Sequence, residues 1–269
     1  MSTPGTEVQP AGWYSDPAGQ ARFRYWDGRS WTHQTTNAKD PTAPKPVLGT
    51  GFARLSDWLG RCLLLVALSA IGVAGAFAWM ASTFDGYLDG SVSAAFGAGQ
   101  SGIAAPQPVN ADGPVIALLV ACAVYGLSAL VTGVLWCVWQ YQLAAAAPGE
   151  LRRGPGLQVA SWIIPLVNYW WPFQNMADIW NAYGVGRDRA DREAASGIGV
   201  WWAAYLGLPV LVGLLGGLWV GAGTAENAFA RVALMYAGVF LSTMVSATLA
   251  RGVVRRLSWR ALLTWASLQ

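Results

Sequence analysis

Charged side chains are scarce in this sequence of 269 residues, because Asp, Glu, Lys and Arg together make up only 12% of it. A soluble domain normally carries about 25% charged residues, so the composition excludes a single water-soluble core of this size. The hydrophobic content of 54% also excludes a disordered chain. The formal net charge of +3 is too small to indicate a nucleic-acid partner.

Residue types that carry out chemistry are equally scarce. The sequence has one His, His33, and three Cys whose spacing matches no metal site and defines no disulfide. It contains no phosphate-binding glycine loop, zinc motif or nucleophile elbow. Because an enzyme needs at least a positioned nucleophile or acid–base pair, we expect a protein with no catalytic residue, no metal and no cofactor.

Long uncharged runs dominate the rest of the chain. Four of them are rich in Leu, Val, Ala and Gly, and each is long enough to cross a bilayer, for which about 20 residues suffice. The predicted spans cover residues 62–83, 115–139, 199–220 and 231–250. The first run starts far too late in the chain for a cleaved signal peptide. The sequence therefore predicts a mainly α fold with a four-helix transmembrane bundle.

A fifth apolar segment, residues 157–182, is interrupted by prolines and amides. Pro165 and Pro172 each remove a helical hydrogen bond, and Asn168 lies between them. The tryptophans of the segment are typical of the headgroup level, where aromatic rings concentrate. The pattern predicts a segment that does not cross the membrane, and it leaves open whether the segment is re-entrant or lies on the surface.

The distribution of basic residues favours one orientation. If the N-terminus is inside and only the four runs cross, every Lys and Arg except Arg231 falls on the cytoplasmic side. If residues 157–182 also crossed, the basic loop that follows them and the basic C-terminus would move outside. We therefore expect a multi-pass protein of a bacterial plasma membrane with both termini cytoplasmic.

The first 54 residues are of a different kind. A flexible tail over residues 1–10 and a linker over residues 37–54 flank a Trp-rich module at residues 11–36. The dipeptide Asp27-Gly28 between alternating aromatic and polar residues predicts a hairpin with a type I′ turn. We expect a small antiparallel β-meander whose rings are Trp13, Tyr25, Trp26 and Trp31. These rings either only form the core of a very small domain or also expose a face that binds a partner.

The module carries the pattern Gly-Trp-Tyr-x-Asp-Pro followed by Arg-Tyr-Trp-Asp-Gly-x-x-Trp-Thr. The matching positions are Gly12, Trp13, Tyr14, Asp16, Pro17, Arg24, Tyr25, Trp26, Asp27, Gly28, Trp31 and Thr32. It resembles a short Trp-rich domain of unknown function at the N-termini of membrane proteins from high-GC Gram-positive, actinobacterial-type bacteria. The resemblance implies a module and no reaction.

A second pattern, Trp-x-x-Pro-x-x-Asn-x-x-x-Pro with an acidic-Ile-Trp tail, lies in the interrupted segment. Its residues are Trp162, Pro165, Asn168, Pro172, Asp178 and Trp180. It resembles the signature of a multi-span membrane domain of unknown function, which by span order extends over residues 55–250. Members of that family often have a basic residue and an Asn just after the second span, where this sequence has Gln140 and Gln142.

Two further patterns concern packing. Residues 251–269 combine an apolar helical stripe with Arg255, Arg256 and Arg260, which predicts a basic amphipathic helix lying on an anionic inner leaflet. Glycines recur every fourth position at Gly213, Gly217 and Gly221. This spacing predicts close helix packing within the bundle, or else between two copies in a homo-oligomer.

Our hypothesis from these patterns is a non-enzymatic, membrane-anchored adaptor or scaffold whose cytoplasmic module binds an unidentified protein partner. The alternative is a transporter or small-solute pore built on the broken segment around Pro165, Asn168 and Pro172. The interiors of the four spans contain no Asp, Glu, Lys, Arg or His. Such residues are the usual marker of ion coupling, so the sequence gives transport less support.

Overall fold

The computed structural model describes residues 10–36, 46–97, 112–148, 151–184, 189–224 and 227–266. The chain divides into two compact units, Met1–Pro46 and Val47–Gln269. Nearly all of the expected N-terminal tail, half of the expected linker and the last three residues lie outside the described residues.

The N-terminal unit contains a three-stranded antiparallel sheet in the order β1-β2-β3. The strands are β1 (Gly12–Ser15), β2 (Phe23–Trp26) and β3 (Trp31–Thr36). Pairing places Trp13 opposite Tyr25 and Trp26 opposite Trp31, and the ring centres of these pairs are 5.3 and 5.2 Å apart. The predicted meander is confirmed.

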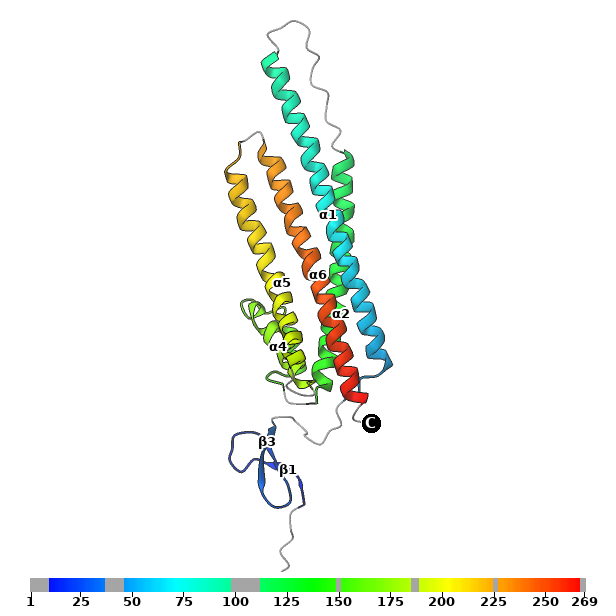
Figure 1. Ribbon diagram of the computed structural model, residues 1–269, viewed down its shortest axis with the longest axis vertical. Helices are drawn as coiled ribbons and strands as arrows, with labels where there is room; N and C mark the ends of the chain where they lie inside the picture. Colours follow the sequence, from blue (N-terminus) through cyan, green and yellow to red (C-terminus); the bar gives the residue numbers. More distant parts are fainter. Residues whose placement is uncertain are drawn as a thin grey trace, which may run out of the picture. The chain divides into compact units, whose positions relative to one another are not determined.

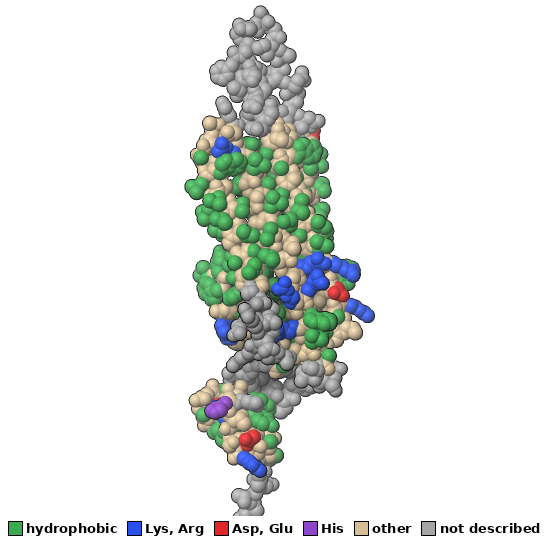
Figure 2. All heavy atoms as spheres, in the orientation of Figure 1, with side chains coloured by type: hydrophobic (Ala, Val, Ile, Leu, Met, Phe, Trp, Pro, Cys, Tyr) green, Lys and Arg blue, Asp and Glu red, His purple; other side chains and the backbone are tan. Residues whose placement is uncertain are grey.

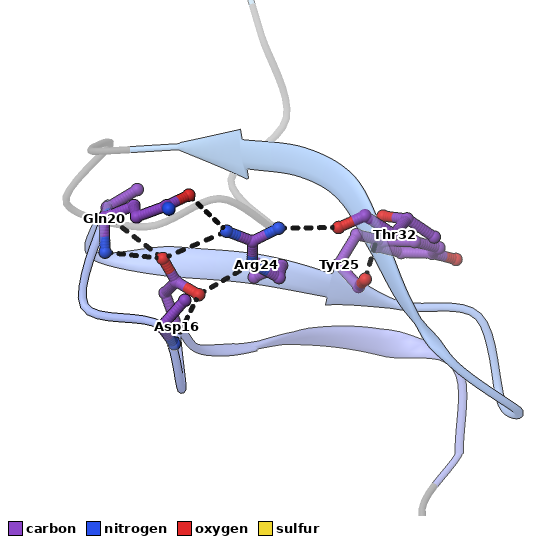
Figure 3. Close-up of polar contacts among 7 residues, drawn as sticks. Asp16, Gln20, Arg24, Tyr25 and Thr32 are labelled. Atoms are coloured by element: carbon purple, nitrogen blue, oxygen red, sulfur yellow. Dashed lines mark hydrogen bonds and ion pairs between the residues drawn. The ribbon is translucent and has the colours of Figure 1, made fainter.

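An ion pair organises the loop between β1 and β2 (Figure 3). Arg24 donates from Nε to Asp16 at 2.7 Å and from Nη1 to the Thr32 carbonyl at 3.0 Å. The Asp16 carboxylate also accepts from the backbone N–H groups of Ala18, Gln20 and Ala21. The guanidinium is the largest cause that holds the pKa of Asp16 well below its usual range, and these N–H donors add to it.

The turn between β2 and β3 differs from the prediction. A type I′ turn needs positive φ at both Asp27 and Gly28, but only Gly28, at +94°, has it. The connection is a four-residue loop in which Asp27 Oδ1 accepts from the N–H groups of Arg29 and Ser30 at 2.7 and 2.6 Å. The Asp side chain caps the loop, which is a common role of Asp in turns.

The membrane unit is built on four long helices that run side by side in Figure 1. They are α1 (Thr50–Gly97), α2 (Asp112–Ala146), α5 (Arg189–Gly221) and α6 (Ala228–Ala266). Helix α1 packs against α2 and α6, and α5 packs against α6. All four are long and apolar enough to cross a membrane, which confirms the predicted number of spans.

Each helix is longer than its predicted span. An uncharged run marks only the part that fits in hydrocarbon, whereas backbone hydrogen bonding continues into the headgroup region. One consequence is that α1 already begins at Thr50, inside the expected linker. We call the end of the bundle that holds the start of α1 and the end of α6 the Thr50 end.

The C-terminal tail is not a separate helix lying on the leaflet. Helix α6 continues without a break to Ala266, and Val254, Leu257 and Ala261 are fully buried. They belong to the main core at the Thr50 end, together with Leu59 of α1 and Trp139 of α2. The apolar stripe of the tail is covered by protein because α1 begins early enough to pack against it.

The regularly spaced glycines of α5 do not make the close helix contact that was predicted within the bundle. A Cβ added to Gly213, Gly217 or Gly221 would meet no neighbouring atom within 4 Å, so these glycines do not mediate packing within the bundle. The close approach of α5 and α6 depends instead on Gly216, which faces Met235, and on Gly238 of α6.

We predict that acid unfolds the N-terminal unit through Asp16. A lowered pKa in the folded state stabilises the fold above the ordinary value of 3.8, and this stability is lost as the pH falls below it. In the full-length protein, pepsin cleavage within residues 12–36 should accelerate between about pH 4 and pH 2. Asp16→Asn should be cleaved rapidly already at the upper end of this range and show little further change.

The control is Asp57→Asn, because Asp57 is exposed and makes no ion pair with a described residue. This variant should follow the wild-type profile. Equal pH profiles for the wild type and Asp16→Asn would contradict the role of the ion pair.

Candidate functional site

The segment that follows α2 folds back on itself. It consists of α3 (Pro155–Ala160), the 3-10 helix η1 (Val167–Tyr169) and α4 (Trp171–Ala182). At 1.5 Å per residue, neither α3 nor α4 can cross a core about 30 Å thick. The chain reverses around Leu166, the only described residue other than glycine with positive φ, at 65°. The side chains of Ile163 and Leu166 at this reversal are 80% and 72% exposed, so an apolar surface is directed outward.

Gln140 joins this segment to α2. Its Oε1 accepts the indole N–H of Trp162 at 2.7 Å and that of Trp136 at 3.2 Å. Gln140 is fully buried, and the two indoles pack edge to face at 5.8 Å. Trp162, the Trp of the motif, therefore attaches the folded-back segment to α2 through its hydrogen bond to Gln140.

A second buried network holds α3 against α4. Asn175 donates from Nδ2 to Ser161 Oγ at 3.0 Å, and its Oδ1 accepts from Arg153 at 3.0 Å. Arg153 also donates to Gln174 at 2.8 Å and lies over the Trp171 ring at 4.1 Å. Arg153 makes no ion pair with a described carboxylate, and the segment itself provides its hydrogen bonds and its ring contact.

Beside the reversal lies a pocket of about 640 Å³ between α2, α5 and α6. Its lining consists of Tyr125, Pro165, Leu166, Asn168, Tyr169, Tyr205, Leu206, Pro209, Thr243 and Ser246. The lining is apolar with a few hydroxyls and one amide, and it contains no charged side chain. Asn168 Oδ1 is buried without a hydrogen-bond donor. This size and composition are typical of small-molecule pockets.

The motif residues divide between the pocket and the supporting framework. Pro165 and Asn168 line the pocket, whereas Pro172 is buried in the first turn of α4 and does not reach it. Asp178 forms an ion pair with Arg152 at 3.4 Å. Trp180 is buried beneath the Arg260 guanidinium, which lies 4.5 Å from its ring centre.

The three basic residues expected at the lipid surface have two different environments. Arg255 and Arg256 are exposed, but Arg260 donates from Nε to the Tyr183 carbonyl at 3.0 Å. With its contact to Trp180, Arg260 is a packing residue that closes the end of α4 onto α6.

In the N-terminal unit, the four predicted aromatic residues form two ring pairs, Trp13 with Tyr25 and Trp26 with Trp31, and the two pairs lie on opposite faces of the sheet because Tyr25 and Trp26 are successive strand residues. Trp13, Tyr25 and Trp26 are half-buried, and Trp31 is 38% exposed. Tyr14, which the prediction omitted, contacts Trp31 edge to face at 6.3 Å. Among the described residues of the chain, no group of three His, Cys, Asp or Glu side chains could hold a metal ion.

Sequence reasoning missed Gln140, Asn175 and the two pocket tyrosines, Tyr125 and Tyr205. A signal existed for Gln140, since an amide at the end of an apolar run needs partners. No signal existed for the tyrosines, because their approach depends on how α2 and α5 pack.

Four long apolar helices with a folded-back, Trp-anchored segment define a multi-span membrane protein. The family model described as "Domain of unknown function (DUF4328)" matches residues 109–258, more than half of the chain, and the protein belongs to that family. A second, "Protein of unknown function (DUF2510)", matches residues 11–44. A comparison with curated proteins found no match, and a comparison with solved structures found none either.

We predict that Gln140→Leu destabilises the membrane unit by about 1–3 kcal/mol, because two buried indole N–H groups lose their acceptor. The measurement is the midpoint of unfolding in mixed detergent micelles. The matched control is Gln142→Leu, since Gln142 is half-buried and has no hydrogen bond among the described residues. Equal destabilisation by the two substitutions would show that the indole hydrogen bonds contribute nothing specific.

Proposed function

We propose that the protein is a non-enzymatic scaffold of a bacterial plasma membrane that presents its N-terminal module to a cytoplasmic protein partner. The observation that carries the proposal is the construction of the module. Its sheet, the Asp16–Arg24 pair and its ring contacts all lie within residues 12–36. Trp31 nevertheless stays 38% exposed, although burial would stabilise so small a domain.

The surface around Trp31 has the chemistry of a protein-binding site. Tyr14 and Trp26 both contact the Trp31 ring edge to face, so the exposed ring is held in a fixed position. Rigid aromatic anchors of this kind are enriched at the energetically dominant positions of interfaces. A pre-positioned Trp also loses little conformational entropy on binding.

The charge distribution supports a cytoplasmic location for the module. Among the described residues, the arginines of the membrane unit concentrate toward the Thr50 end, and Arg231 is the single one near the opposite end. By the positive-inside rule the Thr50 end faces the cytoplasm. The module precedes α1 in the chain and is joined to this same end.

We predict that Trp31→Ala removes partner capture while leaving the membrane unit intact. A photoreactive amino acid at Arg29, which is exposed near Trp31, would crosslink the full-length protein to its partner in cells. Capture should fall at least about tenfold in Trp31→Ala, as expected for loss of an interface anchor. The control Trp219→Ala, which removes a similarly exposed Trp from the membrane unit, should have no effect.

If crosslinks to a discrete protein persist unchanged in Trp31→Ala, the ring is not the binding element. If the module crosslinks only to lipid or to its own chain, the scaffold proposal fails.

A second candidate is passage or binding of a small uncharged solute through the pocket. The observation that favours it is Asn168 Oδ1, which is buried beside the pocket without a donor. The lining contains no charged side chain, which argues against ions and proton coupling. Polar solutes with hydroxyl or amide groups fit this lining best.

We predict that, if this candidate is right, flux of uncharged solutes into proteoliposomes is lost in Asn168→Ala. The matched control is Asn181→Ala, because Asn181 is an exposed asparagine at the end of α4. Flux that is absent for a panel of polyols and amides, or equal in both variants, would count against the candidate.

A further inference from the structure

The arginines of the membrane unit whose side chains are described fall into two groups. Arg152, Arg153, Arg231 and Arg260 all donate hydrogen bonds to protein acceptors. The others make no hydrogen bond or ion pair with any described residue, and they are Arg54 and Arg61 of α1 and Arg251, Arg255 and Arg256 of α6. A guanidinium carries five N–H donors and favours an anionic acceptor, and this second group has no hydrogen-bond acceptor among the described residues.

Two of these arginines adjoin Gly60 of α1, one across the seam from α6 and the other next to it along the chain. The side chain of Arg251 crosses Gly60, where an added Cβ would lie 4.0 Å from its Cγ and from its Nε. Arg251 Nε is buried there without an acceptor. Arg61 directly follows Gly60, and its guanidinium carbon lies 5.2 Å from the centre of the Trp58 ring.

This seam lies at the boundary between hydrocarbon and headgroups. Arg61 is the last charged residue before the uncharged stretch of α1, and Arg251 is the first one after that of α6. Just past Arg61, Leu64, Leu65 and Leu68 are 42–56% exposed, as expected for a surface that faces lipid tails. Trp58 is 58% exposed, and Trp is enriched at this level of membrane proteins.

We propose that Arg61 and Arg251, with Trp58, form a binding site for the phosphate of an anionic phospholipid in the leaflet at the Thr50 end. Guanidinium groups bind phosphate oxygens in a bidentate manner. Basic pockets between transmembrane helices bind anionic headgroups in this way. The acyl chains extend along the exposed leucines of α1, and the Trp58 ring lies at the headgroup level.

The neighbouring charges favour an anion. Arg54 and Arg255 are exposed on the same two helices one to two turns closer to the chain ends, and they raise the local positive potential. The opposing charge on α1 is Asp57, which is exposed and makes no ion pair with a described residue. Figure 2 shows basic side chains gathered on the α1 side of this end of the bundle.

The test measures lipid retention by the full-length protein. Protein is reconstituted in nanodiscs of phosphatidylcholine with a minor fraction of phosphatidylglycerol, then extracted into detergent, and bound lipids are counted by native mass spectrometry. The wild type should retain phosphatidylglycerol in preference to phosphatidylcholine. The double variant Arg61→Gln, Arg251→Gln should retain about thirtyfold less, since each basic group near an anionic surface contributes about 1 kcal/mol and each 1.4 kcal/mol is a factor of ten.

The matched control is the double variant Arg152→Gln, Arg231→Gln, which removes the same charge from arginines that the protein itself engages. It should retain phosphatidylglycerol like the wild type. Equal retention in both double variants, or equal retention of the two lipids by the wild type, would overturn the proposal.

Two further measurements keep the test decisive. If the double variant does not fold, as judged by helix content and gel filtration, Arg61→Gln alone serves, because Arg61 is exposed and makes no hydrogen bond or ion pair with a described residue. It should still lower retention severalfold.

Millimolar glycerol phosphate is the soluble competitor, and it should not displace the lipid. Complete displacement would identify a site for soluble phosphate and overturn the lipid assignment.

Discussion

Hydrocarbon offers no hydrogen-bond partners, so each polar group that enters the bilayer has to find a partner within the protein. Several side chains of the membrane unit satisfy this constraint. Ser56, Thr132 and Ser246 donate to carbonyls four residues earlier on their own helices. Between helices, Trp139 donates to Ser258 and Tyr183 donates to the Leu143 carbonyl. The bundle is therefore held at the Thr50 end by apolar packing and by a few buried hydrogen bonds. Loss of one of these bonds would lower the free energy of unfolding, because it leaves a buried polar group without a partner.

The same constraint applies to the folded-back segment. Where Gln140 and Asn175 supply partners, the broken chain becomes a rigid part of the core. Some buried side-chain atoms of the described residues have no partner, among them Gln140 Nε2, Asn168 Oδ1 beside the pocket and Arg251 Nε on α6. Polar groups that the protein itself leaves unsatisfied are the best structural pointers to a ligand. Asn168 Oδ1 lies beside a neutral pocket and Arg251 Nε on a cationic seam, so the two places select different chemistry.

The N-terminal unit has a different problem, since its chain is too short for an ordinary core. A charged pair, ring pairs and a capped loop replace the missing apolar volume. Among the described residues, these contacts all lie within residues 12–36. This locality supports the proposed role of the module.

The sequence by itself determined the number of membrane helices, the interruption around Pro165 and Pro172, and the small aromatic meander. These features depend on charge-free length, on proline and on strand alternation, which are all local along the chain. Only the tertiary structure decided that Trp162 bonds to Gln140, that α6 continues into the core, and that Gly216 makes the close contact in place of Gly213 and Gly217. Periodicity places a residue on a face of its helix, but the partner of that face depends on packing between segments far apart in the chain.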